Sequence, residues 1–229
     1  MATERGQALN LEPGLRVLDV ASGTGTSALH VAETFDCEVV GVDYGADNVR
    51  VANEEAAARG LIGRVQFQQG DSELLPFEDA SFDAIICECA FCTFPDKAKA
   101  GAQFHRVLRR GSRLGLSDIT RSDTLPEALD SLMAWVACIA DARPVDGYTE
   151  MLQAAGFRMD SVTVHDDALT QMVNQIRGKL LGLEIAVGLK KINLAGVDFT
   201  NAKHMAKAAL EAINAGQLGY ALITATRIG

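Results

Sequence analysis

Short apolar runs alternate with helical stretches along the first half of the chain, and this alternation constrains the fold most. The runs that predict β-strands are Arg16–Val20, Glu38–Val42, Val65–Gln69, Phe82–Cys87 and Arg113–Asp118. The stretches that predict helices are Thr26–Phe35, Ala46–Arg59 and Lys97–Leu108. Parallel strands need crossover connections, which are usually helical and right-handed. The sequence therefore predicts a doubly wound α/β fold whose parallel sheet is covered by helices on both faces.

In the second half of the chain, the expected helices and strands no longer alternate regularly. The expected elements are a helix over Glu127–Ala140, a turn at Arg143–Gly147, a helix near Thr149–Ala155, and strands over Phe157–Val164 and Gly219–Arg227. The last strand is expected to complete the sheet. Residues 166–217 are too long for a hairpin connection, and their apolar spacing predicts a helical insertion. We expect the 229 residues to form a single domain, 1–229, that includes this insertion.

Charge and hydropathy exclude several classes of protein. Lys and Arg number 21 against 30 Asp and Glu, so the formal net charge is −9. A nucleic acid or an anionic membrane as the main partner would require a positive face. No apolar run approaches the ~20 residues of a membrane span, and Met1–Asn10 lacks the apolar core of a signal peptide. We therefore expect a cytoplasmic protein.

Three of the five cysteines gather near the end of the fourth expected strand, at Cys87, Cys89 and Cys92. An odd number of cysteines without a secretion signal indicates reduced thiols. We expect Cys37 and Cys87 to be small buried apolar residues. The spacing also suggests zinc, but no fourth ligand follows at finger-like spacing and the four histidines are scattered.

A glycine loop, Asp19-Val20-Ala21-Ser22-Gly23-Thr24-Gly25, joins the first expected strand to a helix. Glycines there allow a tight turn and a close approach to a ligand. Asp43 ends the second strand about twenty residues on, where a carboxylate accepts from ribose hydroxyls. The segment Gly23–Ala28 also satisfies a loose dinucleotide pattern, so an NAD enzyme and a purely structural turn are alternative interpretations.

Two acidic residues favour S-adenosyl-L-methionine as the ligand of this loop. Asp19, just before the loop, suits the ammonium group of S-adenosyl-L-methionine and would repel a pyrophosphate. Asp71 follows the third expected strand and is placed to accept from an adenine amino group at the carboxyl edge of the sheet.

With these residues in place, the chain resembles class I S-adenosylmethionine-dependent methyltransferases. The matching segments are Val17–Gly25, Asp43, Gly70–Phe77 (GDSELLPF) and Phe104–Asp118 (FHRVLRRGSRLGLSD). The resemblance covers roughly residues 14–160, and the subgroup includes ubiquinone/menaquinone and arsenite methyltransferases. It implies a Rossmann-like sheet of seven strands with the last antiparallel, S-adenosyl-L-methionine as cofactor, and a small-molecule acceptor. Ala21 replaces the usual first glycine and Ser22 the common cysteine; both are small, so we expect donor binding to persist.

The resemblance also implies roles for individual residues. The implied donor contacts are Asp19, Ala21, Ser22, Gly23, Thr24 and Gly25 around the methionine part, Asp43 and Tyr44 at the ribose, Asp71 and Ser72 at the adenine, and Glu88 near the methyl group. Cys89, next to Glu88 in the chain, is likewise implied to lie near the methyl group.

Cys89 and Cys138 correspond to the two cysteines that hold trivalent arsenic in the arsenite methyltransferases. Soft thiolates prefer soft metalloid centres, so the resemblance implies that Cys89 and Cys138 bind thiol-bound arsenic as the acceptor, with Glu88 as a third catalytic residue. For an organic acceptor, a quinone-like or other oxygen or carbon acceptor, the candidate bases are Asp118, Asp141 and Glu88.

Other interpretations remain open at this point. Trp135 and Met133 either wall an acceptor pocket or are core residues, and His105 is expected to pack rather than act as a base. A module that binds S-adenosyl-L-methionine or a metalloid without catalysis is a second class of function, since fold does not imply function. An NAD-linked oxidoreductase is a third. A homodimer is compatible with the sequence.

Overall fold

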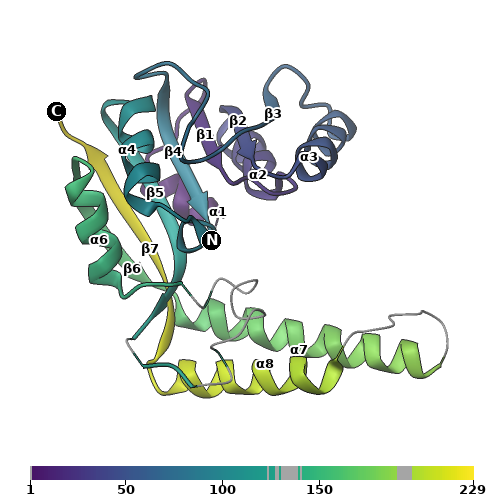
Figure 1. The fold of residues 1–229 in the computed structure, drawn as a ribbon. Helices are drawn as coiled ribbons and strands as arrows, with labels where there is room; N and C mark the ends of the chain where they lie inside the picture. Colours follow the sequence, from purple (N-terminus) through teal and green to yellow (C-terminus); the bar gives the residue numbers. More distant parts are fainter. Residues whose placement is uncertain (1, 123, 127–128, 130–138, 140, 190–197) are drawn as a thin grey trace. The chain divides into compact units, whose positions relative to one another are not determined.

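A computed structural model describes residues 2–122, 124–126, 129, 139, 141–189 and 198–229. Within these residues, seven strands form one mixed sheet in the order β3-β2-β1-β4-β5-β7-β6, with the last strand, β7, antiparallel (Figure 1). This arrangement confirms the predicted α/β fold with a doubly wound, Rossmann-like sheet.

The helices and strands follow the expected alternation. They are α1 (Ala2–Ala8), β1 (Arg16–Val20), α2 (Thr26–Phe35), β2 (Glu38–Asp43), α3 (Ala46–Ala58), β3 (Val65–Gln69), β4 (Phe82–Glu88), the 3-10 turn η1 (Phe91–Thr93), α4 (Lys97–Val107), β5 (Leu108–Arg121), α6 (Val145–Ala154), β6 (Phe157–Val164), α7 (Asp166–Gly188), α8 (Phe199–Asn214) and β7 (Leu218–Arg227).

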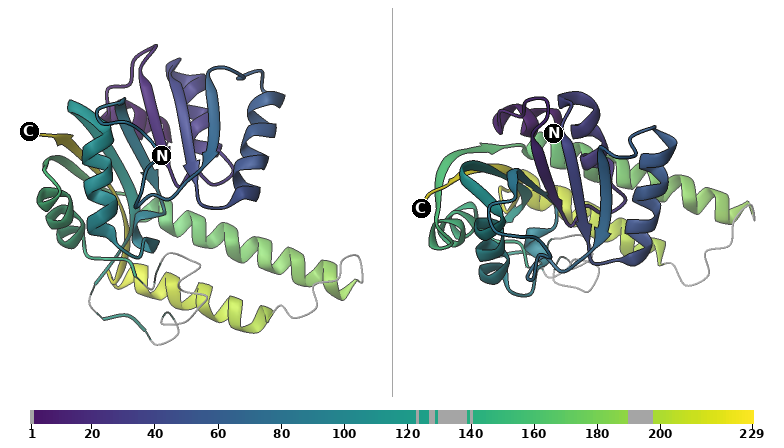
Figure 2. Two further views of the ribbon diagram at one scale, coloured as in Figure 1. Left: turned by 45° about the horizontal axis from the view of Figure 1, so that its top comes forward. Right: turned by 90° about the horizontal axis from the view of Figure 1, so that it is seen from above.

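The chain divides into two compact units. The first comprises residues 1–118, 146–163 and 222–229, and the second comprises 119–145 and 164–221. In the second unit α7 and α8 lie side by side (Figure 2). They follow β6 and precede β7, where the sequence predicts the helical insertion. That residues 1–229 act as one domain stays a prediction.

The middle of the sheet supplies the core of the first unit. Val17, Leu18 and Val20 of β1 and Ile85 and Ile86 of β4 are each fully buried. Parallel strands covered on both faces are continuously apolar in this way, because neither face meets water. β1 pairs in parallel with both β2 and β4. The strand order therefore reverses between β1 and β4, which is where open α/β sheets bind ligands at the carboxyl edge.

The structure corrects several predicted boundaries. Helix α1 was not predicted from the sequence. Strand β5 begins at Leu108, directly after α4 and five residues before the predicted start. Leu108 is buried, but residues 109–111 that follow it are exposed and carry no apolar signal. Helix α6 begins at Val145, just after Pro144, rather than at Thr149; proline is tolerated at a helix start because it lacks an N–H there. The helix predicted over Glu127–Ala140 lies mostly outside the described residues.

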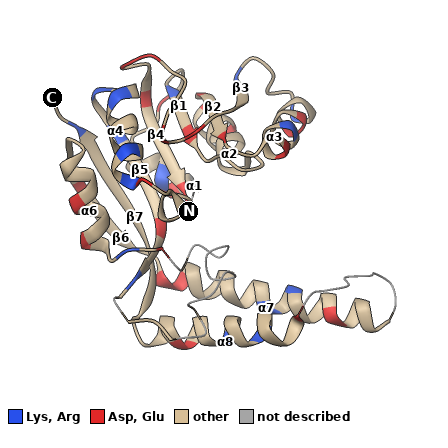
Figure 3. Ribbon diagram, in the orientation of Figure 1, with Lys and Arg blue, Asp and Glu red and all other residues tan. Residues whose placement is uncertain are grey.

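Charged side chains are distributed in both signs on the first unit. On α3, Asp47, Arg50 and Glu54 form ion pairs one turn apart, and Figure 3 shows red and blue residues together on this helix. Alternation of this kind is typical of a solvated helix face. No helix in the described part of the chain has the length and apolar character needed to cross a membrane.

Candidate active site

The loop between β1 and α2 turns through left-handed residues. Ala21 (φ 56°), Gly23 (φ 53°) and Gly25 (φ 85°) have positive φ. The amide of Gly25 donates to the carbonyl of Ser22 at 2.9 Å and closes the turn. A Cβ on Gly25 would lie 2.5 Å from Cζ of Phe67, so this position requires glycine. Ala21 adopts the conformation that glycine would adopt without strain, and the loop keeps its shape.

Asp43, the last residue of β2, holds the loop in place. Its Oδ2 accepts from the amide of Gly23 at 2.7 Å, and its Oδ1 accepts from the amide of Gly45 at 2.9 Å and from Nδ2 of Asn48 at 3.0 Å. A carboxylate offers about four acceptor positions, so three contacts leave room for a ligand hydroxyl. The position suits the predicted ribose role, which stays a prediction.

A pocket of about 430 Å³ opens at the carboxyl edge of the sheet beside the glycine loop. Its lining comes from the ends of β2 and β3 and from the segment after η1, all within the first unit. The lining residues are Ala21, Val42, Asp43, Tyr44, Gly70, Asp71, Ser72, Glu73, Thr93, Phe94 and Pro95. The structure thus brings Asp43, Tyr44, Asp71 and Ser72 together as the sequence predicts. Thr93, Phe94 and Pro95 were missed, because their loop has no strong pattern of its own.

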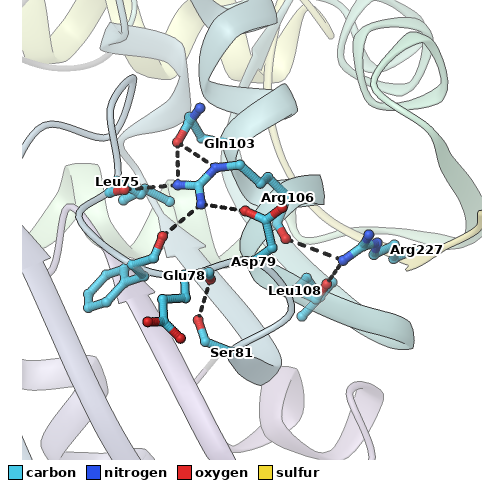
Figure 4. Close-up of polar contacts among 9 residues, drawn as sticks. Leu75, Glu78, Asp79, Ser81, Gln103, Arg106, Leu108 and Arg227 are labelled. Atoms are coloured by element: carbon cyan, nitrogen blue, oxygen red, sulfur yellow. Dashed lines mark hydrogen bonds and ion pairs between the residues drawn. The ribbon is translucent and has the colours of Figure 1, made fainter.

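Arg106 of α4 contacts the segment that follows Asp71 and Ser72 in the chain (Figure 4). The Arg106 guanidinium donates to the carbonyls of Leu75 and Phe77 at 2.9 and 2.7 Å, and contacts Asp79 Oδ1 at 2.9 Å. Gln103 Oε1 accepts from Arg106 Nη2 at 2.7 Å and so helps to fix the orientation of the guanidinium. These contacts fix an otherwise irregular loop, since buried carbonyls need donors.

Asp19 lies in the penultimate position of β1 and only 2% of it is exposed. Burial raises the pKa of Asp19 to about 7, while the charge of Arg5 lowers it and the charges of Glu88 and Asp43 raise it further. The carboxyl therefore titrates near neutral pH. Perturbed acids in a cleft are candidate functional groups.

Two buried polar atoms beside the glycine loop have no hydrogen-bond partner within the described residues: Asp19 Oδ2 and Ser22 Oγ. Buried polar atoms are nearly always paired in folded proteins. An acceptor and a hydroxyl left open at this edge fit a ligand that brings an ammonium group and other polar atoms. The residues present therefore fit the amino-acid part of S-adenosyl-L-methionine.

Glu88, at the end of β4, is held by two partners. Ser27 Oγ donates to Glu88 Oε2, and Arg5 Nη2 lies 2.8 Å from Glu88 Oε1. Burial alone would raise the pKa of Glu88, but the Arg5 charge and the hydrogen bonds from Ser27 and Arg5 outweigh it, so the pKa lies below its usual value. Glu88 is therefore an ionised, fixed carboxylate. Arg5 was missed by sequence reasoning, and nothing near it in the sequence marks it.

Comparison with known proteins decides the family. A family model described as a methyltransferase domain matches residues 11–156. O-methyltransferase cnsE of Penicillium expansum is 32% identical over 230 residues, which cover 100% of this chain and 78% of that protein. The chain belongs to the methyltransferase family.

Two further similarities are to an arsenite methyltransferase and to a solved methyltransferase structure. Arsenite methyltransferase of Halobacterium salinarum is 31% identical over 164 residues, which cover 69% of this chain and 41% of that protein. The structure of a geranyl diphosphate methyltransferase in complex with SAM has the same fold, with a TM-score of 0.76 and 18% identity over 99% of this chain and 85% of that one. The chain is an enzyme, and S-adenosyl-L-methionine is its cofactor. This excludes the NAD interpretation of the glycine loop.

The cysteines of this methyltransferase differ in burial. Cys37 and Cys87 are buried, as expected, and Cys92 is buried as well. Cys89 is partly exposed and follows β4 with a φ of 49°. The strand ends at Glu88, so the alternation that would point Cys87 and Cys89 to one side stops there. Cys138 lies outside the described residues, and so do Trp135 and Met133. Within the described part of the chain no His, Cys, Asp and Glu cluster is suited to a metal ion.

Asp118 and Asp141, two of the candidate general bases, already accept hydrogen bonds from other groups of the protein. Asp118 is 2% exposed, and its Oδ2 accepts from the amide of Cys92 at 2.8 Å. Asp141 accepts from Arg143 Nη2 at 2.8 Å. His105 packs its ring edge-on against Phe157 and contacts the carbonyl of Ile228 at 3.1 Å, which agrees with a packing role. A strong general base for the acceptor is therefore absent from these candidates.

Proposed function

We propose that this methyltransferase acts on a small organic molecule and transfers the methyl group to an oxygen atom. The observation that carries the proposal is the extent of the match to O-methyltransferase cnsE, which includes the residues of α7 and α8. The match to arsenite methyltransferase covers a smaller part of the chain. Acceptor specificity resides in the parts that vary between family members, so similarity over the whole chain is the better guide.

The weakness of the candidate bases limits the class of methyl acceptor. Methyl transfer to oxygen needs an oxygen that has lost its proton. Glu88 has a lowered pKa and is paired with Arg5, so it is a weak base. A weak general base lowers the activation barrier of the methyl transfer only a little. We infer that the acceptor carries an acidic hydroxyl, such as a phenol, an enol or a carboxylic acid, and ionises with little help.

The chain's own part in the reaction is alignment. When bound, S-adenosyl-L-methionine supplies a methyl group activated by a sulfonium. The glycine loop, Asp43 and the pocket beside them hold and orient that donor at the carboxyl edge of β1 and β2. Holding two reactants in line replaces an encounter in solution and is worth several orders of magnitude in rate.

A second candidate acceptor is trivalent arsenic bound by thiolates. Cys89 supports it, because its side chain is partly exposed immediately after β4, next to Glu88. The proposal requires Cys138 as the second thiolate. A soft metalloid held by two thiolates would need no base, which is consistent with the engaged carboxylates.

One assay separates the two candidates. Purified, reduced protein is incubated with S-adenosyl-L-methionine and either a panel of phenols, enols and carboxylic acids or arsenite with glutathione. Formation of S-adenosyl-L-homocysteine is followed with the methylated product identified by mass spectrometry. We expect an O-methyl product from an acidic hydroxyl, with turnover retained in Cys89→Ser and Cys138→Ser. Methylated arsenic that disappears in both variants would replace the organic acceptor by the metalloid.

A further inference from the structure

The guanidinium of Arg5 is a buried charged group with unpaired hydrogen-bond donors in the described structure. The residue is 1% exposed, and its Nε and Nη1 have no hydrogen-bond partner within the described part of the chain. A guanidinium has five N–H donors. Nη2 contacts Glu88 Oε1 at 2.8 Å, which balances the charge, but Nε and Nη1 remain without a partner among these residues. Leaving several charged donors unsatisfied in the interior is costly.

The fold makes room for this side chain at a defined place. A Cβ at Gly115 of β5 would lie 3.1 Å from Cγ of Arg5, so the stem of Arg5 packs against β5 where a glycine leaves space. The head reaches Glu88 at the carboxyl end of β4, next to β1. That edge is the point where the strand order reverses, which is the ligand-binding crevice of an open α/β sheet.

In the described structure, an unpaired acceptor of opposite charge, Asp19 Oδ2, lies on β1, the strand that pairs with β4. Asp19 Oδ2 on β1 is buried without a hydrogen-bond partner among the described residues, and the charges of Arg5 and Glu88 both act on Asp19. Glu88, by contrast, has both oxygens occupied, one by Ser27 and one by Arg5. Within the described residues, Arg5 thus brings unpaired cationic donors and Asp19 an unpaired acceptor to this region, and the carboxylate of Glu88 holds the guanidinium through its ion pair.

We propose that Arg5 is a donor-binding residue: its guanidinium binds the α-carboxylate of S-adenosyl-L-methionine while Asp19 accepts from the α-ammonium. An α-amino acid carries both groups on one carbon, so it satisfies the open donors and the open acceptor together. Arginine matches a carboxylate in a bidentate geometry that lysine does not reproduce. Glu88 is then a positioning residue for Arg5. The inference rests on the cofactor and is independent of the acceptor.

The test removes the carboxylate from the ligand rather than only the arginine from the protein. Titration calorimetry on the full chain compares S-adenosyl-L-homocysteine with its decarboxylated analogue, which keeps the ammonium and the adenosine. We expect the wild-type protein to bind the analogue roughly 10- to 100-fold more weakly, the range for a charge-assisted hydrogen-bonded pair. In Arg5→Gln the two ligands should bind alike, within about threefold. Arg5→Lys should show an intermediate preference, because one point charge replaces a planar fork.

Glu88→Gln is the matched control, since it removes the partner of Arg5 but leaves the guanidinium. The preference for the carboxylate should be smaller in Glu88→Gln but not abolished, because the guanidinium remains and loses only the carboxylate that positions it. Equal binding of both ligands by the wild-type protein overturns the inference without any variant. The inference can therefore be refuted even if Arg5→Gln does not fold. Arg5→Gln that weakens both ligands by the same factor also overturns it, because Arg5 would then only support the fold. Absence of binding of S-adenosyl-L-homocysteine itself would contradict the donor assignment.

Discussion

Donor affinity should depend on pH through Asp19. The pKa of Asp19 is raised to about 7 by burial in the folded protein. If only the ionised carboxylate accepts from the donor's ammonium, the ionised fraction is about 0.76 at about pH 7.5 and about 0.03 at about pH 5.5. Affinity for S-adenosyl-L-homocysteine should therefore fall about 25-fold over this range. Calorimetric titrations at several pH values measure the dissociation constant directly.

Asp19→Asn supplies the control for this profile. The variant cannot ionise, so its donor affinity should be weaker by roughly 10- to 100-fold at about pH 7.5 and nearly independent of pH. A wild-type profile that is flat, or a profile of the same slope in Asp19→Asn, would refute the assignment of the titration to Asp19.

The same substitution should affect stability in the opposite sense. The folded-state pKa lies above the model value of 3.8, so the folded protein keeps a proton that the unfolded chain releases, and stability falls as the pH rises from about 4 to about 7. The ionised carboxylate costs about 4 kcal/mol at the upper end. Asp19→Asn should unfold at a higher temperature than the wild type at about pH 8, with the difference shrinking toward about pH 4.

Three further substitutions test the loop and its support. Ala21→Gly should stabilise the protein by up to about 1 kcal/mol in thermal unfolding and keep donor affinity, because Ala21 has a φ of 56° that glycine adopts without strain. Gly25→Ala should cost about 2 kcal/mol or more and abolish donor binding, since its Cβ would meet Phe67 at 2.5 Å; retained affinity would contradict the close approach. Arg106→Gln should weaken donor binding and lower stability by about 1–3 kcal/mol, because it leaves the Leu75 and Phe77 carbonyls without their donor. The midpoint of its pH profile should not move.

Local patterns in the sequence predicted much of the fold. Apolar runs ending in small or acidic residues marked β1 to β4, because parallel strands covered on both faces have to be apolar throughout. Residues at the ends of these strands, such as Asp43 and Asp71, line one pocket because parallel strands end at one edge of the sheet; their roles toward the donor stay predictions. The start of β5 was missed, since the exposed residues 109–111 separate the buried Leu108 from the apolar part of the strand.

The sequence by itself determined the α/β architecture, the glycine loop and the acids that follow the strands, because each depends on residues that are neighbours in the chain. Only the tertiary structure decided the raised pKa of Asp19 and the ion pair between Glu88 and Arg5. These properties depend on burial and on charges contributed by α1, β1 and β4, which are far apart in sequence. A short helix with one arginine has no pattern that reveals its burial, since the sheet against which it packs is formed by residues elsewhere in the chain.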